Sequence, residues 1–547
     1  MKKFLTVLFL TGLLTTRIAA AENPAKTAGA GRAILGINDD QKRIVVTAVT
    51  ADGSAIQVEG CTVTEFPSGE ETVLTATGTK VILKGAITKL DCGGNRLTEL
   101  NVQGLTSLQK LFCDDNLLTS LDVSGVTALQ SLSCGENLLT SLDVSGLTGL
   151  RELYCDRNHL SSLDVQSLTA LQDLFCNANK LTSLNVQDLK VLQRLHCNSN
   201  RLTLLDVQDL SALQELDCVG NELTSLDVHG VTALWELECS KNMLTLLDVQ
   251  SLTSLSKLDC SANQLTSLDV RNLAALEELD CSNNKLTALY VQGLNALQEL
   301  NCSENELTSL EIQGLTALEV LDSGRNDLTS LDVRNLAALE KLDCRDNKLT
   351  SLDVRGLNTL QKLYCSENEL TSLEIQGLKT LQKLNCYKNK LTSLNVQGLT
   401  ALQWLNCGYN ELTTLNLKGL HALRDLECFN NNLAELDVQD INTLQRLNCY
   451  HNKISTLELS TLHGLQELCC YDNLFNEKTL IRILTALPDR KQKKEGRALI
   501  YGKKNDLREG TITDFSSSAE LKAAFEAAKA KNWRFYKRDT VGNEEEV

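Results

Sequence analysis

Cysteine is the residue type with the greatest capacity for chemistry in this chain. Of its 20 cysteines, all but Cys61 and Cys469 occupy one column, which repeats every 21 residues from Cys92 to Cys470 and is interrupted only at Ser323. Thiols can form disulfides or bind metals, but ligands separated by 21 residues lack the clustered spacing of a zinc site. The motif LxxLxC alternates apolar and polar positions, so the column should point into a core as small apolar side chains.

Disulfides are the other chemistry open to such a column. Stacked strands lie ~4.8 Å apart, which is within the Cα–Cα range that a disulfide tolerates. A dozen bridged pairs would distort a regular parallel ladder, so we expect buried free thiols. Cys469 directly precedes the last member of the column. It should therefore face outward and be the most reactive thiol.

No motif typical of catalysis accompanies the cysteines. The six histidines are scattered, and the sequence contains no HExxH, GxSxG, CxxC or GxxxxGK[ST] pattern. Carboxylate pairs are abundant, but they recur at surface positions of a repeat, where solvation explains them. We therefore expect no enzymatic activity, no catalytic residues, no metal site and no cofactor. A pocket in one of the end segments is the remaining enzymatic alternative.

The elements that position these residues follow from an internal repeat. Eighteen 21-residue units run without insertion or deletion from Ile87 to Gly464, and half of a nineteenth begins at Leu465. Leucine or isoleucine opens every unit, and the eighth residue after each opener is asparagine in all nineteen, from Asn95 to Asn473. Such strict repetition predicts a solenoid, in which each unit stacks only on its neighbours.

Each unit divides into a strand, an asparagine turn and a return segment. In the unit LQKLYCSENELTSLEIQGLKT, from Leu360 to Thr380, the first half alternates as a strand that is buried on one side. Stacked units should join these strands into a parallel sheet, and each asparagine amide should satisfy backbone groups of its own and a neighbouring unit. The return half has few strong helix formers, so we expect extended structure there and a gently curved or twisted rod.

The same residues carry a resemblance to a known family. The pattern LxxLxCxxNxLTxLDVxxLxx, from Ile87 to about Leu474, resembles the 21-residue bacterial class of leucine-rich repeats, as in internalin-like surface and secreted proteins. The resemblance implies a β-rich leucine-rich repeat solenoid with a parallel sheet on its inner face, an extended return side and small caps. It also implies protein–protein or protein–glycan interaction in adhesion, host contact, virulence or biofilm formation.

The ends of the chain predict its cellular location. Lys2 and Lys3, an apolar stretch from Phe4 to Leu14 and three alanines before Glu22 are typical of a signal peptide, so we expect a secreted or cell-surface bacterial protein. No apolar run is long enough to predict a transmembrane segment. The formal charge is −17 at pH 7. Because such an acidic surface repels phosphates, we expect no nucleic-acid partner.

Five segments make up the predicted domain organisation. They are a signal peptide (1–21), a flexible segment (22–39), a β N-terminal cap (40–86), the solenoid of 18 full repeats plus a half (87–473), and an α/β C-terminal cap and tail (474–547). In the C-terminal cap we expect helices at Thr479–Leu487 and after Ser517, with Glu520 completing a capping box, and disorder from Asn543.

The candidate binding residues lie on the outward face of the predicted sheet. Its outward positions are two, four and six residues after each opener, and aromatic residues gather there although they make up only 4% of the chain. Exposed aromatic side chains are typical of binding hot spots. We predict a ligand site in the C-terminal third, formed by Tyr364, Tyr387, Trp404, Tyr409, Phe429, Tyr450 and Tyr471. A secondary patch near the start comprises Phe112, Tyr154, Phe175 and His196.

Each of these surfaces also has a structural interpretation. Stacked aromatic residues could stiffen the last rungs and help to dock the end cap. Between the two aromatic groups lies an acidic sector, which could attract a basic partner or divalent cations, or could keep the ribbon soluble. It comprises Glu215, Asp217, Glu236, Glu238, Asp259, Glu278, Asp280 and Glu299. For the whole chain, the alternative to binding a protein or glycan is a self-associating surface coat without a specific ligand.

Overall fold

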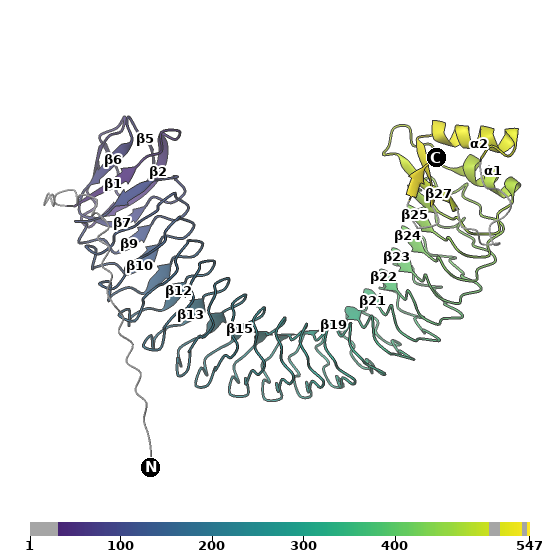
Figure 1. The fold of residues 1–547 in the computed structure, drawn as a ribbon, viewed down its shortest axis with the longest axis horizontal. Coiled ribbons are helices and arrows are strands. Elements are labelled where there is room, and N and C mark those ends of the chain that lie inside the picture. The colour runs from purple at the N-terminus through teal and green to yellow at the C-terminus, as the bar shows by residue number, and fades with distance from the viewer. Residues whose placement is uncertain (1–30, 503–514, 539–543) are drawn as a thin grey trace, which may run out of the picture.

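The repeats build an arc with one cap at each end (Figure 1). The computed structural model describes residues 31–502, 515–538 and 544–547, and the predicted signal peptide lies outside these ranges. Strands line the inner side of the arc, and irregular segments form its outer side. The solenoid predicted from the repeat is confirmed.

One short strand from each unit forms the parallel sheet on the inner side. Successive strands pair in register at an offset of one unit, as in Leu342 with Leu363. The strands are β7 (Ile87–Asp91), β9 (Lys110–Phe112), β10 (Ser131–Ser133), β11 (Glu152–Tyr154), β12 (Asp173–Phe175), β13 (Arg194–His196), β14 (Glu215–Asp217), β15 (Glu236–Glu238), β16 (Lys257–Asp259), β17 (Glu278–Asp280), β18 (Glu299–Asn301), β19 (Val320–Asp322), β20 (Lys341–Asp343), β21 (Lys362–Tyr364), β22 (Lys383–Asn385), β23 (Trp404–Asn406), β24 (Asp425–Glu427), β25 (Arg446–Asn448) and β26 (Glu467–Cys469).

Leucine, valine and cysteine fill the space between the sheet and the return side. In one unit Leu360, Leu363, Cys365 and Leu370 are all fully buried. The same columns are buried in every unit, and all eighteen column cysteines are fully buried. The predicted burial of the thiol column is confirmed, and the cysteines occur as free thiols.

The asparagine column ties each unit to the one before it. The Asn368 amide nitrogen donates to the carbonyl oxygens of Cys344 at 2.9 Å, Ser366 at 3.2 Å and Cys365 at 3.3 Å. Its carbonyl oxygen accepts from the backbone N–H of Leu349 at 3.0 Å. Because the side chain is 8% exposed, these bonds satisfy backbone groups that water does not reach. The role predicted for the asparagines is confirmed.

The return side consists of consecutive turns rather than a continuous strand. In one unit the N–H of Leu357 bonds to Val354 O at 3.3 Å, and the N–H of Leu360 bonds to Leu357 O at 3.1 Å. Extended pairing there is limited to β8 (Glu99–Asn101) and isolated bridges such as Asp353 with Glu374. Turns stack less closely than hydrogen-bonded strands, so the return side is the wider one and the sheet becomes concave. The chain is therefore a pronounced arc, and the gently curved rod predicted from the sequence was wrong.

Acidic residues on the return side hold these turns. Asp353 Oδ1 accepts the backbone N–H of Arg355 at 3.1 Å, two residues later. The Arg355 guanidinium also pairs with this carboxylate at 2.7 Å. These hydrogen bonds hold the pKa of Asp353 down at about 2. Asp122, Asp143 and Asp269 accept the same backbone bond at the corresponding positions of other units, so these return-side carboxylates have a structural role.

The N-terminal cap continues both faces of the first unit. It contains β1 (Arg32–Gly36), β2 (Arg43–Thr50), β3 (Ile56–Glu59), β4 (Glu65–Phe66), β5 (Glu71–Thr75) and β6 (Lys80–Lys84). Strand β2 pairs with β7 on the concave side, and β1 pairs with β8 on the return side. Strand β1 lies within the segment 22–39 predicted to be flexible. That prediction was wrong for Arg32–Gly36, because pairing with β6 and β8 fixes the strand.

The C-terminal cap extends the sheet and covers the last unit. It contains α1 (Glu477–Ala486), β27 (Gly496–Gly502), α2 (Ala519–Ala530), β28 (Trp533–Arg538) and β29 (Glu544–Glu546). Strand β27 continues the parallel sheet beside β26. The cap of α2 is Ser518, whose hydroxyl accepts the Leu521 N–H at 3.1 Å, so the prediction of Ser517 was wrong by one residue. The predicted disorder was also wrong for Glu544–Glu546, because β29 pairs with β28.

Candidate functional site

The concave face presents three columns of side chains to the inside of the arc. They are the first and third residues of each strand and the residue two positions after it, which correspond to the second, fourth and sixth residues after each opener. The candidate residues come from these columns, except Tyr409, which lies one position further on. Because neighbouring strands are in register, residues of one column lie beside each other along the arc.

Five of the seven candidate residues form one continuous aromatic ridge, comprising Tyr387, Tyr409, Phe429, Tyr450 and Tyr471. The rings of Phe429 and Tyr450 stack at a centroid distance of 4.8 Å, and those of Tyr450 and Tyr471 stack at 4.7 Å. The Tyr409 ring meets Tyr387 at 5.3 Å and Phe429 at 5.7 Å, edge to face in both cases. The structure therefore brings together residues from five successive units.

A glycine makes the ridge continuous. Gly408 occupies the sixth-position column between Tyr387 and Phe429, and the Phe429 ring lies over it. A Cβ at position 408 would be 2.9 Å from that ring. The open space lets Phe429 approach Tyr387 to a centroid distance of 6.0 Å across two units. Phe429 is 9% exposed and serves as the base of the ridge, whereas Tyr409 is 47% exposed.

The other two candidate residues, Tyr364 and Trp404, form a separate pair. Their ring centroids are 6.4 Å apart and the rings are tilted by 51°. Both side chains are half-buried. The predicted ligand site is thus two adjoining groups on the same concave face, a tilted pair and a stacked ridge.

Three residues of the secondary patch also meet. Phe175 stacks on His196 at a centroid distance of 4.1 Å, and Tyr154 meets Phe175 edge to face at 5.0 Å. Phe112 lies apart, because Ser133 occupies the strand between it and Tyr154. The patch therefore comprises three aromatic rings, with Phe112 outside it.

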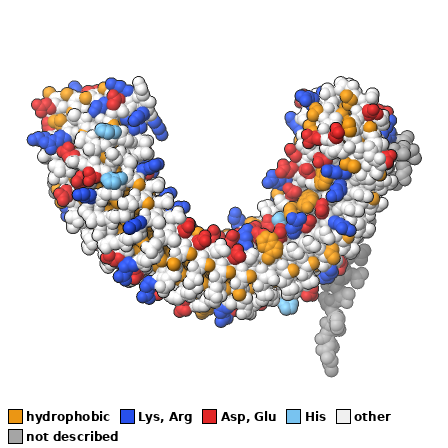
Figure 2. Space-filling model, turned by 180° about the vertical axis from the view of Figure 1, so that it is seen from behind, with side chains coloured by type: hydrophobic (Ala, Val, Ile, Leu, Met, Phe, Trp, Pro, Cys, Tyr) orange, Lys and Arg blue, Asp and Glu red, His pale blue; other side chains and the backbone are white. Residues whose placement is uncertain are grey.

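The part of the acidic sector from Glu238 to Glu299 lines an open groove at the base of the arc. The groove includes residues from Glu238 to Lys341, and Asp and Glu side chains gather along the inner rim in Figure 2. Lys257 neutralises part of the sector, since its Nζ lies 2.7 Å from Glu236 and 2.5 Å from Glu238. Burial, with a contribution from Glu238, raises the pKa of Asp217. Among the residues that the structure describes, no group of three or more potential ligands could hold a metal ion.

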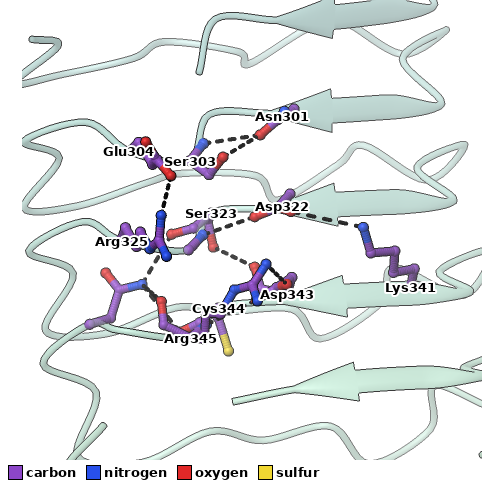
Figure 3. A network of polar contacts seen from close by, with 12 residues as sticks. Asn301, Ser303, Glu304, Asp322, Ser323, Arg325, Lys341, Asp343, Cys344 and Arg345 are labelled. Carbon is purple, nitrogen blue, oxygen red and sulfur yellow. Dashed lines mark hydrogen bonds and ion pairs between the residues drawn. The ribbon is translucent and has the colours of Figure 1, made fainter. Parts of the chain in front are cut away.

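A buried carboxylate, Asp343, lies two units beyond Glu299, the last residue of the acidic sector (Figure 3). Asp343 is 2% exposed and pairs with Arg345 at 3.0 Å. Burial and the neighbouring Asp322 raise the pKa of Asp343 to about 6. Ser323, the one interruption of the cysteine column, is fully buried and donates to the carbonyl oxygen of Asp343 at 3.4 Å.

Sequence reasoning missed three lysines on the concave face, here called the lysine strip. Lys341, Lys362 and Lys383 occupy the second-position column on consecutive strands, and Trp404 follows in the same column. The lysine strip therefore lies between the acidic sector and the aromatic ridge. Comparing the second-position residues of successive units, as was done for the aromatic residues, would also have revealed the lysine strip.

The described residues offer little reactive chemistry. Burial raises the pKa of every column thiol, and that of Cys176 reaches about 12, so these cysteines stay protonated and inert. Cys469 is half-buried at the concave face and lines a groove with Tyr450 and Arg446, so its predicted outward position is confirmed. No helix in the described part of the chain is long and apolar enough to cross a membrane.

Solved structures similar to this chain are leucine-rich repeat proteins. YopM from Yersinia enterocolitica is 26% identical with a TM-score of 0.55, over 71% of this chain and 83% of its own. The functional domain of InlJ from Listeria monocytogenes, which includes a cysteine ladder, is 29% identical with a TM-score of 0.43, over 77% and 75%. The ectodomain of the Arabidopsis thaliana receptor kinase GASSHO1/SCHENGEN3, solved with CASPARIAN STRIP INTEGRITY FACTOR 2, is 20% identical with a TM-score of 0.48, over 80% and 68%.

No protein-family model and no curated protein matches the chain. The likeness to solved structures and the repeat geometry together confirm the predicted fold class. The chain is a leucine-rich repeat solenoid with a small cap at each end. Such a solenoid is a protein-interaction scaffold, because its concave face offers a long surface for contact.

Proposed function

We propose that this leucine-rich repeat protein is exported and binds a protein or glycan through the C-terminal third of its concave face. Its role would be adhesion, host contact or biofilm formation at a bacterial surface. The observation that carries the proposal is the aromatic ridge together with Tyr364 and Trp404, which places seven aromatic side chains on one open face.

Physical chemistry favours contact with a partner at this place. Tyrosine and tryptophan contribute large contact areas at a small cost in side-chain entropy, and they are enriched among binding hot spots. Tyr409 is 47% exposed even though its ring meets Tyr387 and Phe429, so the fold leaves much of its apolar surface in water. Contact with a partner would remove that apolar area from water at about 25 cal/mol per Å².

A purely structural role is the competing explanation. The stacked rings of Tyr450 and Tyr471 stabilise the last units next to the C-terminal cap, and each aromatic pair contributes about 1 kcal/mol. In that case the chain would be a surface coat that self-associates without a specific ligand. Trp404 and Tyr409 distinguish the two roles, because neither belongs to the Phe429–Tyr450–Tyr471 stack.

The proposal is tested with two matched double variants. Trp404→Ala/Tyr409→Ala removes two rings from the candidate site. Trp235→Ala/Tyr290→Ala removes the same two side-chain types outside it, where Trp235 is 39% and Tyr290 52% exposed. Each labelled protein is titrated onto host cells, matrix proteins and the surface of the source bacterium, and its melting temperature is recorded.

The proposal predicts saturable binding that the first variant loses and the second keeps, at similar melting temperatures. Equal binding by both variants would reject the concave aromatic site. If no surface binds saturably and the chain instead self-associates, the coat function replaces adhesion.

A further inference from the structure

We infer that the concave face binds an acidic polypeptide segment, whose carboxylates lie on the lysine strip and whose apolar side chain contacts Trp404. This inference rests on the proposed function and names the chemistry of its partner. It concerns Lys341, Lys362 and Lys383, which neither the fold nor the aromatic ridge explains.

The lysine strip concentrates positive charge on an acidic protein. Its members are direct neighbours across parallel strands, so their Cα atoms are about 4.8 Å apart. Like charges placed opposite each other on adjacent strands destabilise a sheet. An anionic ligand would relieve this repulsion, which is a favourable term that a neutral ligand cannot provide.

Close ion pairs within the fold do not neutralise the charges of the lysine strip. None of the ion pairs among the described residues includes Lys362 or Lys383, and Lys341 is only loosely paired, with its Nζ 3.8 Å from Asp322. Elsewhere lysines pair closely with neighbouring units, as Lys388 does with Glu367 and Lys390 with Glu369, at 2.7 and 2.9 Å. The strip therefore differs from the paired lysines beside it.

The groups around the strip suit an amphipathic chain. Trp404 continues the lysine column on the next strand, and Tyr364 lies within 6.4 Å of it. Asn385 and Asn406 lie side by side in the adjacent column, so their amides flank the same track. An extended segment rises ~3.3 Å per residue, so about five residues cover the distance from Lys341 to Trp404.

The aromatic ridge favours a polypeptide over a sugar chain. Pyranose rings bind by lying flat on an open aromatic face. In the ridge the faces of Phe429, Tyr450 and Tyr471 cover each other, with interplanar angles of 15° and 5°. This stack mainly offers a ligand ring edges and the hydroxyl groups of its two tyrosines, which suit the peptide groups and side chains of a protein.

The test uses the full chain and soluble polymers. A random copolymer of glutamate and tyrosine is the probe, and poly-L-lysine and the polyuronate alginate are the comparisons. The variant Lys362→Glu/Lys383→Glu reverses the strip. The control Lys180→Glu/Lys285→Glu makes the same change in charge at two exposed lysines on another face. Binding is measured at low and high salt, and thermal melting verifies that both variants fold.

The inference predicts saturable copolymer binding that weakens with salt and falls about tenfold or more in the strip variant but not in the control. If both variants lose copolymer binding equally, the net charge of the chain and not the lysine strip determines binding, and the inference is overturned. If the chain binds alginate through the lysine strip but does not bind the copolymer, the partner is an anionic glycan and the inference is overturned. If the strip variant retains cell-surface binding that Trp404→Ala/Tyr409→Ala loses, the inference fails and the proposed function stands.

Discussion

Replacing one ladder asparagine measures how strongly adjacent units are joined. In Asn368→Ala the backbone N–H of Leu349 and the carbonyl oxygens of Cys344, Cys365 and Ser366 each lose a hydrogen bond. The site is buried, since Asn368 is 8% exposed, so water does not readily replace the amide. The Leu349 N–H is then left unsatisfied, which costs about 1–3 kcal/mol. The three carbonyl oxygens keep bonds from Asn347, Asn389 and the Asp346 N–H, so each lost bond costs about 0.5–1.5 kcal/mol, and partial relaxation of the turn reduces the sum. We expect a loss of roughly 4 kcal/mol in the free energy of unfolding.

The assay is urea unfolding followed by circular dichroism, together with hydrogen exchange of the units on either side. A solenoid can unfold in parts, so exchange locates the damage that the global transition averages. Asn358→Ala is the matched control, because this exposed asparagine lies on the return side of the preceding unit. It should change stability by no more than about 0.5 kcal/mol. If Asn368→Ala costs as little as the control, the amide ladder does not hold the units together.

Three further predictions concern buried polar groups. Burial raises the pKa of Asp343 to about 6, so the folded chain binds the carboxyl proton of Asp343 more tightly than the unfolded chain does. The free energy of unfolding therefore falls as pH rises from about 4 to about 6. Asp343→Asn should abolish that fall and stabilise the chain at pH 7 by up to about 3 kcal/mol, as thermal melting across pH would reveal. Ser323→Cys completes the thiol column and should raise the urea midpoint through a gain of roughly 1 kcal/mol, whereas a lower midpoint would mean that the site cannot accept sulfur. Arg490 is 4% exposed and donates to Leu465 O and Lys494 O, both at 2.9 Å. Arg490→Ala should therefore lower the free energy of unfolding by about 3 kcal/mol and make the C-terminal cap sensitive to protease. Unchanged proteolysis would contradict this prediction.

The repeat made most of the fold predictable. Strict columns reveal which residues are inward, so Cys365 and Asn368 could be placed from spacing alone. The return side was less predictable, because extended segments and consecutive turns use similar residues and differ in local hydrogen bonds such as Leu357 N–H to Val354 O. Strand β1 was missed because its order comes from distant partners in β6 and β8.

The candidate site was predictable by column and unpredictable in its contacts. Alternation placed Phe429 and Tyr450 on the outward face, and the structure stacks them at 4.8 Å. Contact between Tyr387 and Phe429 depends on the missing side chain of Gly408, which spacing alone does not reveal. The lysine strip was overlooked because a lysine on an acidic surface is ordinarily solvated or paired. Lys388 pairs with Glu367, whereas Lys383 has no ion pair among the described residues, and only the structure reveals this difference.

The central claim, that the C-terminal concave face contacts the partner, is tested most directly by hydroxyl-radical footprinting. The full chain is oxidised alone and on a surface that it binds saturably, and mass spectrometry compares the exposed aromatic residues. We predict that binding lowers the oxidation of Trp404 and Tyr409 and leaves that of Trp235 and Tyr290 unchanged. Protection of Trp235 or Tyr290, with Trp404 and Tyr409 oxidised as in the free chain, would contradict the account.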